Sequence, residues 1–256
     1  TLADTAAPEA IARAAKSLGA RSVAYTYTDP VVFHEYAIDV AAACRDVGVK
    51  SVAVSAGYVD PKPRTEFYAF MDAANIDLKG FTEEFYFKLT GAHLQPVLDT
   101  LIYIKHETDV WLEITTLLIP GHNDSDSELD AMTRWVQENL GADVPLHFSA
   151  FHPDWKMMDV PPTPPATLTR ARDIAMKNGI RYAYVGNVHN PDADSTWCHH
   201  CGEKLIGRDW YNLSDWNIST DGNCTSCQTP VAGVFEAEPG DWGARRQSVI
   251  LQNFAA

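Results

Sequence analysis

Six short runs rich in β-branched and aromatic residues alternate with helix-like segments along this chain. Successive runs begin roughly 24 to 36 residues apart, which leaves room for a crossover helix between each pair. Strands connected in this way pair in parallel through right-handed crossovers. The sequence therefore predicts an α/β fold, a partial (open) parallel βα barrel. The predicted strands are 22–28, 51–55, 75–79, 111–118, 146–151 and 181–185.

One face of these strands is polar. Because side chains alternate along a strand, Asn75, Asp77 and Lys79 share one face, and Ile76 and Leu78 share the other. Strands buried on both faces are instead nearly continuous apolar runs. We therefore expect a polar lumen that binds a small-molecule ligand; the alternative is an inert lumen stabilised by internal ion pairs. The other lumen-facing residues expected are Tyr25, Tyr27, Glu113, Thr115, His147, Ser149, Tyr182 and Tyr184.

Helix boundaries carry their own signals. Proline at the start and glycine past the end indicate a helix over 8–18, and Asp29-Pro30 opens another that runs to about 47. A short helix is expected around 66–73. Ser125 and Glu128 have the spacing of a capping box.

Four of the five cysteines form two close pairs near the end of the chain. Cys198-x2-Cys201 and Cys224-x2-Cys227 are separated by 22 residues. Four thiolates on two tight turns match tetrahedral zinc, and a site filled by four sulfurs is closed and structural. Two disulfides or an iron centre are the alternatives. We expect three parts: a barrel over 1–190, a zinc ribbon over 191–235 and a C-terminal tail over 236–256.

Charge and hydropathy restrict the partners. The net charge of −14 does not favour binding to nucleic acid or to an anionic membrane surface. No run approaches the ~20 apolar residues of a membrane span, and no signal-peptide pattern is present. Cysteines arranged to bind a metal indicate a reducing compartment, so we expect a cytoplasmic protein.

Several motifs together resemble the radical-SAM proteins of the AmmeMemoRadiSam group, relatives of pyruvate formate-lyase activating enzymes. The resemblance runs in order from about residue 8 to 235 and includes the C-terminal ribbon. It implies a partial barrel that binds S-adenosylmethionine and a [4Fe–4S] cluster. The motifs are the segments 24–30 (AYTYTDP), 75–80 (NIDLKG), 119–124 (IPGHND), 151–157 (FHPDWKM) and 184–188 (YVGNV).

The resemblance also implies ligand-binding residues. Asp29 would face the methionine amino group, and Asp77, Lys79 and His152 would lie near its carboxylate end. The segment Ile119, Pro120 and Gly121 would border the adenine.

The family pattern is incomplete in these residues. The resemblance places three cluster-binding cysteines, spaced C-x3-C-x2-C, before Pro8, and the 256 residues contain no such spacing. Thiolates are what hold an iron–sulfur cluster. We therefore expect no Fe–S cluster and no radical chemistry from this chain alone, with residues upstream of Thr1 lost from a longer gene as one explanation.

Two other functions are open. Asp77 and Glu113, two lumen carboxylates, can serve a glycosidase-type hydrolase, with Asp77 ionised beside Lys79 and Glu113 as the proton donor. Alternatively, the chain is a protein-binding module in which an exposed sheet edge pairs with another chain.

Overall fold

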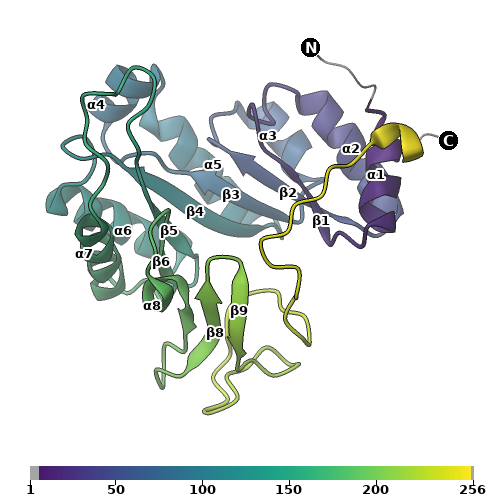
Figure 1. Ribbon diagram of the computed structural model, residues 1–256. Coiled ribbons are helices and arrows are strands. Elements are labelled where there is room, and N and C mark those ends of the chain that lie inside the picture. The colour runs from purple at the N-terminus through teal and green to yellow at the C-terminus, as the bar shows by residue number, and fades with distance from the viewer. Residues whose placement is uncertain (1–5, 255–256) are drawn as a thin grey trace. The chain divides into compact units, whose positions relative to one another are not determined.

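The computed structural model describes residues 6–254, and they form an α/β fold with six parallel strands (Figure 1). The strands are β1 (Ser22–Tyr25), β2 (Lys50–Ser55), β3 (Ala73–Asp77), β4 (Trp111–Leu118), β5 (Leu146–Ala150) and β6 (Ala183–Gly186). The helices are α1 (Pro8–Ser17), α2 (His34–Asp46), α3 (Pro61–Tyr68), α4 (Glu83–Phe85), the π-helix η1 (Tyr86–Thr90), α5 (Leu94–Glu107), α6 (Asp126–Leu140), α7 (Pro165–Lys177) and α8 (Pro191–Asp194).

The strands follow the chain in the sheet, in the order β1-β2-β3-β4-β5-β6, with β1 and β6 at its two ends. The pairs β1–β2, β2–β3, β4–β5 and β5–β6 are all parallel. Because the end strands are not paired with each other among the described residues, the sheet is open. The prediction of an open parallel βα architecture is confirmed.

The contacts within the chain divide it into two units. The first comprises residues 1–78, 93–113 and 247–256, and the second comprises 79–92 and 114–246. Strand β4 begins in the first unit and continues in the second. The predicted division into 1–190, 191–235 and 236–256 follows chain order and remains a prediction.

Side chains alternate between buried and half-exposed along the strands, as the sequence pattern predicts. In β4 the buried residues are Leu112, Ile114, Thr116 and Leu118, and the residues between them are half-exposed. The buried face packs under the helices and forms the core. Strand β3 shows the same alternation, although it begins and ends two residues earlier than expected.

Several expectations were wrong in detail. The strand expected at 22–28 ends at Tyr25, and the helix expected to open at Asp29-Pro30 begins at His34. Tyr25 does not face the lumen, because it is buried with its hydroxyl 3.1 Å from Ser51 Oγ. Tyr182 is buried in the apolar cluster of the C-terminal cysteine region. The helix expected at 66–73 is α3, Pro61–Tyr68, because its proline at the first position sets where it begins.

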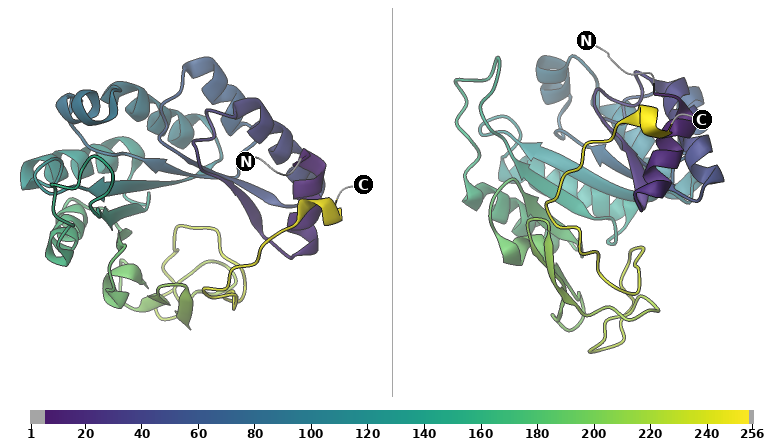
Figure 2. Two further views of the ribbon diagram at one scale, coloured as in Figure 1. Left: turned by 45° about the horizontal axis from the view of Figure 1, so that its top comes forward. Right: turned by 45° about the vertical axis from the view of Figure 1, so that its right-hand side comes forward.

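After β6 the chain forms a small antiparallel sheet of β7 (Thr196–Trp197), β8 (Lys204–Asp209) and β9 (Asn212–Trp216). Its core contains Leu205, Ile206 and Ile218 together with Cys198 and Cys224. The last element, the 3₁₀ helix η2 (Leu251–Phe254), lies against α1 in both views of Figure 2, where Arg13 Nε donates to the Phe254 carbonyl at 2.8 Å. Across residues 6–254, no helix is both long and apolar enough to cross a membrane.

Candidate functional site

The loop after β3 is held by side chains that bond to three of its backbone groups. The Lys79 amide donates to Tyr86 Oη at 3.1 Å, and the Lys79 carbonyl accepts from Asn123 Nδ2 at 2.6 Å. The Phe81 amide donates to Glu128 Oε1 at 2.7 Å. Groups at the carboxyl ends of parallel strands are where α/β folds place their ligands. This loop is therefore a fixed platform at the position where a ligand is expected.

Glu128 departs from the capping box that the sequence predicts. Ser125 Oγ does accept from the Glu128 amide at 3.3 Å, which caps α6. The Glu128 carboxylate, however, accepts from Phe81 in the loop after β3. Burial raises the pKa of Glu128, although the Phe81 amide opposes that rise. The helix cap thus also supports the loop.

Gly80 has no room for a side chain. A Cβ at this position would lie 2.7 Å from Phe85 Cδ1 and 2.8 Å from Phe85 Cγ. Phe85 is itself buried at the end of the following helix, α4. The loop therefore passes directly over an aromatic ring, and glycine is required here for space.

The loop after β4 is tied to the loop after β3. Asn123 Nδ2 donates to the Leu117 carbonyl at 2.9 Å as well as to Lys79, and Asn123 Oδ1 accepts from the Ile119 amide at 2.7 Å. Gly121 has a φ of 75°, and its amide donates to Asp124 Oδ1 at 2.8 Å. Ile119 is buried, Pro120 is half-buried and Gly121 is exposed. Hydrogen bonds from Asn123 and Asp124 therefore fix the backbone of residues 119–121, the segment expected to border a ligand.

Asp29 joins the ends of β1 and β2. Its carboxylate accepts from the amides of Val31 at 3.0 Å and Ala56 at 2.8 Å, and from Ser55 Oγ at 3.0 and 3.2 Å. A carboxylate has about four acceptor sites, so these bonds occupy most of its capacity. Burial, and then the charge of Asp29, raise the pKa of the neighbouring Tyr68. In this structure Asp29 supports the strand ends.

The residues proposed as a catalytic group lie on one face of the sheet. The Trp111 amide donates to the Asp72 carbonyl at 3.1 Å, which aligns Trp111 with Ala73. In the same register, Glu113 of β4 is aligned with Asn75 of β3, and Asp77 lies two residues after Asn75 along β3. Trp111 Nε1 donates to Glu113 Oε1 at 3.0 Å.

A second polar row crosses β4, β5 and β6. The register aligns Thr115 with His147, and His147 with Tyr184. The rings of His147 and Tyr184 stack with their centroids 5.1 Å apart. Tyr184 Oη lies 3.0 Å from Thr196 Oγ1, and the Arg208 guanidinium lies over the Tyr184 ring. The expectation of polar residues on this face is confirmed for His147 and Tyr184. His152 is exposed in the loop after β5.

The four paired cysteines converge. The Sγ atoms of Cys198 and Cys227 are 3.6 Å apart, those of Cys201 and Cys224 are 3.8 Å apart, and all four lie within 4.8 Å of one another. A tetrahedral site with ~2.3 Å metal–sulfur bonds has edges of about 3.8 Å. All four are free thiols. Hydrogen bonds with Thr229 lower the pKa of Cys227, which favours its thiolate form. The cluster can therefore bind one metal ion.

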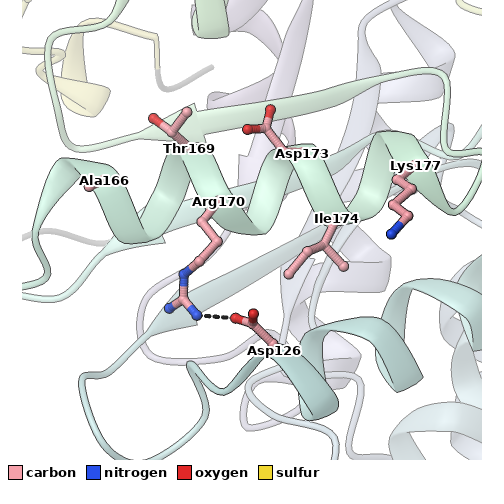
Figure 3. Close-up of a pocket in the computed structure, with 7 residues that line it drawn as sticks. All are labelled: Asp126, Ala166, Thr169, Arg170, Asp173, Ile174 and Lys177. Atoms are coloured by element: carbon pink, nitrogen blue, oxygen red, sulfur yellow. Dashed lines mark hydrogen bonds and ion pairs between the residues drawn. The ribbon is translucent and has the colours of Figure 1, made fainter.

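A hollow of about 510 Å³ lies beside α7, away from the cysteine cluster in the sequence (Figure 3). Arg170 lines this hollow and pairs with Asp126, and its Nη2 donates to the Asp124 carbonyl at 2.9 Å. The guanidinium therefore ties α7 to the start of α6. We regard this hollow as a structural feature rather than a ligand site.

Comparison with known proteins identifies similar sequences. The chain is 38% identical over 221 residues to the uncharacterized protein MJ0808 of Methanocaldococcus jannaschii, a match that covers 86% of this chain and 65% of that protein. It is also similar to two 4-hydroxyphenylacetate decarboxylase activating enzymes. The one from Clostridium scatologenes is 26% identical over 120 residues, covering 46% of this chain and 38% of the enzyme. The one from Clostridioides difficile is 22% identical over 178 residues, covering 65% and 55%. The chain thus spans less than two thirds of each relative.

Solved structures show where the fold recurs. A domain of pyruvate-formate lyase-activating enzyme from Bacteroides vulgatus superposes with a TM-score of 0.57 at 15% identity, covering 65% of this chain and 99% of that domain. A radical SAM methyltransferase from Sphaerobacter thermophilus gives a TM-score of 0.53 at 16% identity, covering 69% and 54%. No protein-family model matches the chain. From these likenesses, the chain has a radical-SAM-like fold, and its sequence relatives include activating enzymes.

Proposed function

We propose that this chain is the S-adenosylmethionine-binding part of a radical-SAM protein related to activating enzymes. The observation that carries the proposal is the pair of fastened loops after β3 and β4, which hold Lys79 and the 119–121 segment at strand carboxyl ends. Similarity to activating enzymes supports the same assignment.

In this proposal the ligand spans the two loops. Lys79 binds the amino-acid end, and Ile119, Pro120 and Gly121 border the adenine. A lysine ammonium suits a carboxylate. Asp29 orders the ends of β1 and β2. When bound, S-adenosylmethionine supplies an activated sulfonium, the source of the radical in this class of protein.

The donor set for an iron–sulfur cluster does not fit this chain. Four of its five cysteines converge in the C-terminal cluster, and Cys44 is buried in α2. Thiolates for a cluster beside Lys79 would have to come from outside the 256 residues. We therefore assign no radical step to these residues alone.

We propose that the cysteine cluster holds structural zinc. Four sulfur ligands at tetrahedral spacing leave no open position for a substrate. The metal would join the two turns that carry the cysteine pairs, and so stabilise the small sheet of β7, β8 and β9.

No observation favours the hydrolase. The relatives and structures described above that have a named activity are activating enzymes and a methyltransferase. The edge position of β1 does favour pairing with a further strand, from a partner chain or from residues outside the sequence. Analytical ultracentrifugation over a concentration series tests whether two copies of this chain pair through β1. A monomer at every concentration would contradict pairing between two copies.

The test of the cofactor assignment is calorimetric titration of the zinc-loaded chain with S-adenosylhomocysteine, a stable analogue. We expect binding that Lys79→Met weakens by about tenfold or more, the scale of one lost charged contact. The matched control is Lys62→Met on α3, where the lysine is exposed. Absence of binding to the unmodified chain would refute the assignment, as would equal affinity in the Lys79→Met variant.

A further inference from the structure

Asn123 uses both ends of its side-chain amide on backbone groups. It is 2% exposed. Both amide hydrogens are engaged, with the Lys79 carbonyl at 2.6 Å and the Leu117 carbonyl at 2.9 Å, and Oδ1 accepts from the Ile119 amide at 2.7 Å. Three of the four hydrogen bonds that an asparagine can form are therefore made inside the protein.

These three partners belong to different segments. Lys79 follows β3, Leu117 lies near the end of β4, and Ile119 begins the loop after β4. One buried side chain thus fixes the spacing between the two loops that the proposed function assigns to the ligand. The adjoining Tyr86 and Glu128 bonds hold only the first of these loops.

We propose that Asn123 is a positioning residue for the cofactor site. By fixing Lys79 relative to Ile119, it sets the distance between the group that binds the amino-acid end and the segment that borders the adenine. Asn123 itself is covered, so it acts through these two loops. This inference rests on the proposed function and adds a residue to it.

Only an amide satisfies all three partners. Aspartate keeps an acceptor for Ile119 but places oxygen against two carbonyl groups, and serine is too short to bridge them. A buried amide or carbonyl left without its partner is costly, so the loops would move to reach water or each other. The ligand would then have to reorder both loops when it binds.

Thr163 provides a matched control in the same unit. It is 5% exposed, its Oγ1 donates to the Leu118 carbonyl at 2.5 Å, and it accepts from the Phe151 amide at 2.9 Å. It therefore also fastens the end of β4, but to the end of β5. Its hydroxyl bonds involve neither Lys79 nor Ile119.

The experiment compares Asn123→Ser and Thr163→Val in the full zinc-loaded chain. Each variant is titrated with S-adenosylhomocysteine and with 5′-methylthioadenosine, which lacks the amino-acid end, below its own melting temperature. Asn123→Ser is expected to weaken S-adenosylhomocysteine at least about tenfold and to reduce the affinity ratio between the two ligands, since coupling of the two loops is lost. Thr163→Val is expected to bind both within about twofold of the unmodified chain despite its own loss of stability.

The outcomes separate the two ideas. Binding by the unmodified chain that Asn123→Ser leaves unchanged overturns this inference and leaves the proposed function standing. Equal weakening by both variants, in proportion to their loss of melting temperature, also overturns it, because Asn123 would then act only on stability. An unmodified chain that binds neither ligand overturns the proposed function, and the inference with it. Should Asn123→Ser fail to fold, Asn123→Asp is titrated in its place with the same expected outcomes.

Discussion

Replacing Asp29 with alanine is expected to lower the stability of the first unit. The change removes the acceptor for three donors, namely the amides of Val31 and Ala56 and the hydroxyl of Ser55. These bonds connect the end of β1 to the end of β2. The chain must then leave the donors unpaired or let water in between the strand ends.

The size of the effect follows from the number of bonds. A hydrogen bond to a charged acceptor contributes about 1.5–3 kcal/mol, and the half-buried setting of Asp29 lets water replace part of it. Taking ~1 kcal/mol for each of the three donors gives a loss of about 3 kcal/mol. In a chain of this size, that corresponds to a fall in melting temperature of about 6–12 °C.

Thermal unfolding followed by circular dichroism measures this change. Asp39→Ala is the matched control, because Asp39 is an exposed carboxylate on α2, where substitutions usually change stability by less than about 0.5 kcal/mol. If Asp29→Ala melts together with this control, Asp29 does not hold the strand ends, and the reasoning from its hydrogen bonds is wrong.

Three further outcomes are expected. Metal analysis should find one zinc per chain, with Cys227→Ser lowering zinc retention against a chelator; full retention in that variant would contradict a four-cysteine site. Because burial raises the pKa of Glu128, the folded protein binds more protons there than the unfolded one, so this group's contribution to stability is present below pH ~4.5 and is lost as pH rises through the raised pKa. Glu128→Gln should make the free energy of unfolding less dependent on pH between about 4.5 and the raised pKa of Glu128. The same pH dependence in this variant as in the unmodified chain would contradict the prediction. Gly80→Ala should cost about 1–3 kcal/mol in denaturant unfolding, since the new Cβ meets Phe85; a neutral result would mean that the ring moves freely.

Strong local signals in the sequence predicted the fold well. Strand β4 has the predicted bounds, because eight residues of alternating pattern leave little freedom in where the strand begins and ends. The cysteine pairs also converge as expected, because the two-residue spacing puts each pair on a tight turn that can share one metal ion with the other pair. Strand β3 was placed two residues late because alternation continues through Leu78 and Lys79, past the last ladder residue.

The parts that were missed depend on distant partners. Tyr25 has a hydroxyl that can be satisfied on either face of a strand, and only the position of Ser51 decides which. Asn123 lies in a motif that the sequence singles out, yet its role depends on a carbonyl 44 residues away. Backbone partners carry no residue-type signal, so no pattern in the sequence could reveal this contact.

The division of the chain into two units has a consequence for how the protein can change. The backbone passes between the units at 78/79, 92/93, 113/114 and 246/247, which makes four passages. Neither unit is therefore a continuous stretch of gene. A single cut of the backbone anywhere between residues 79 and 246 would leave the first unit divided between two fragments.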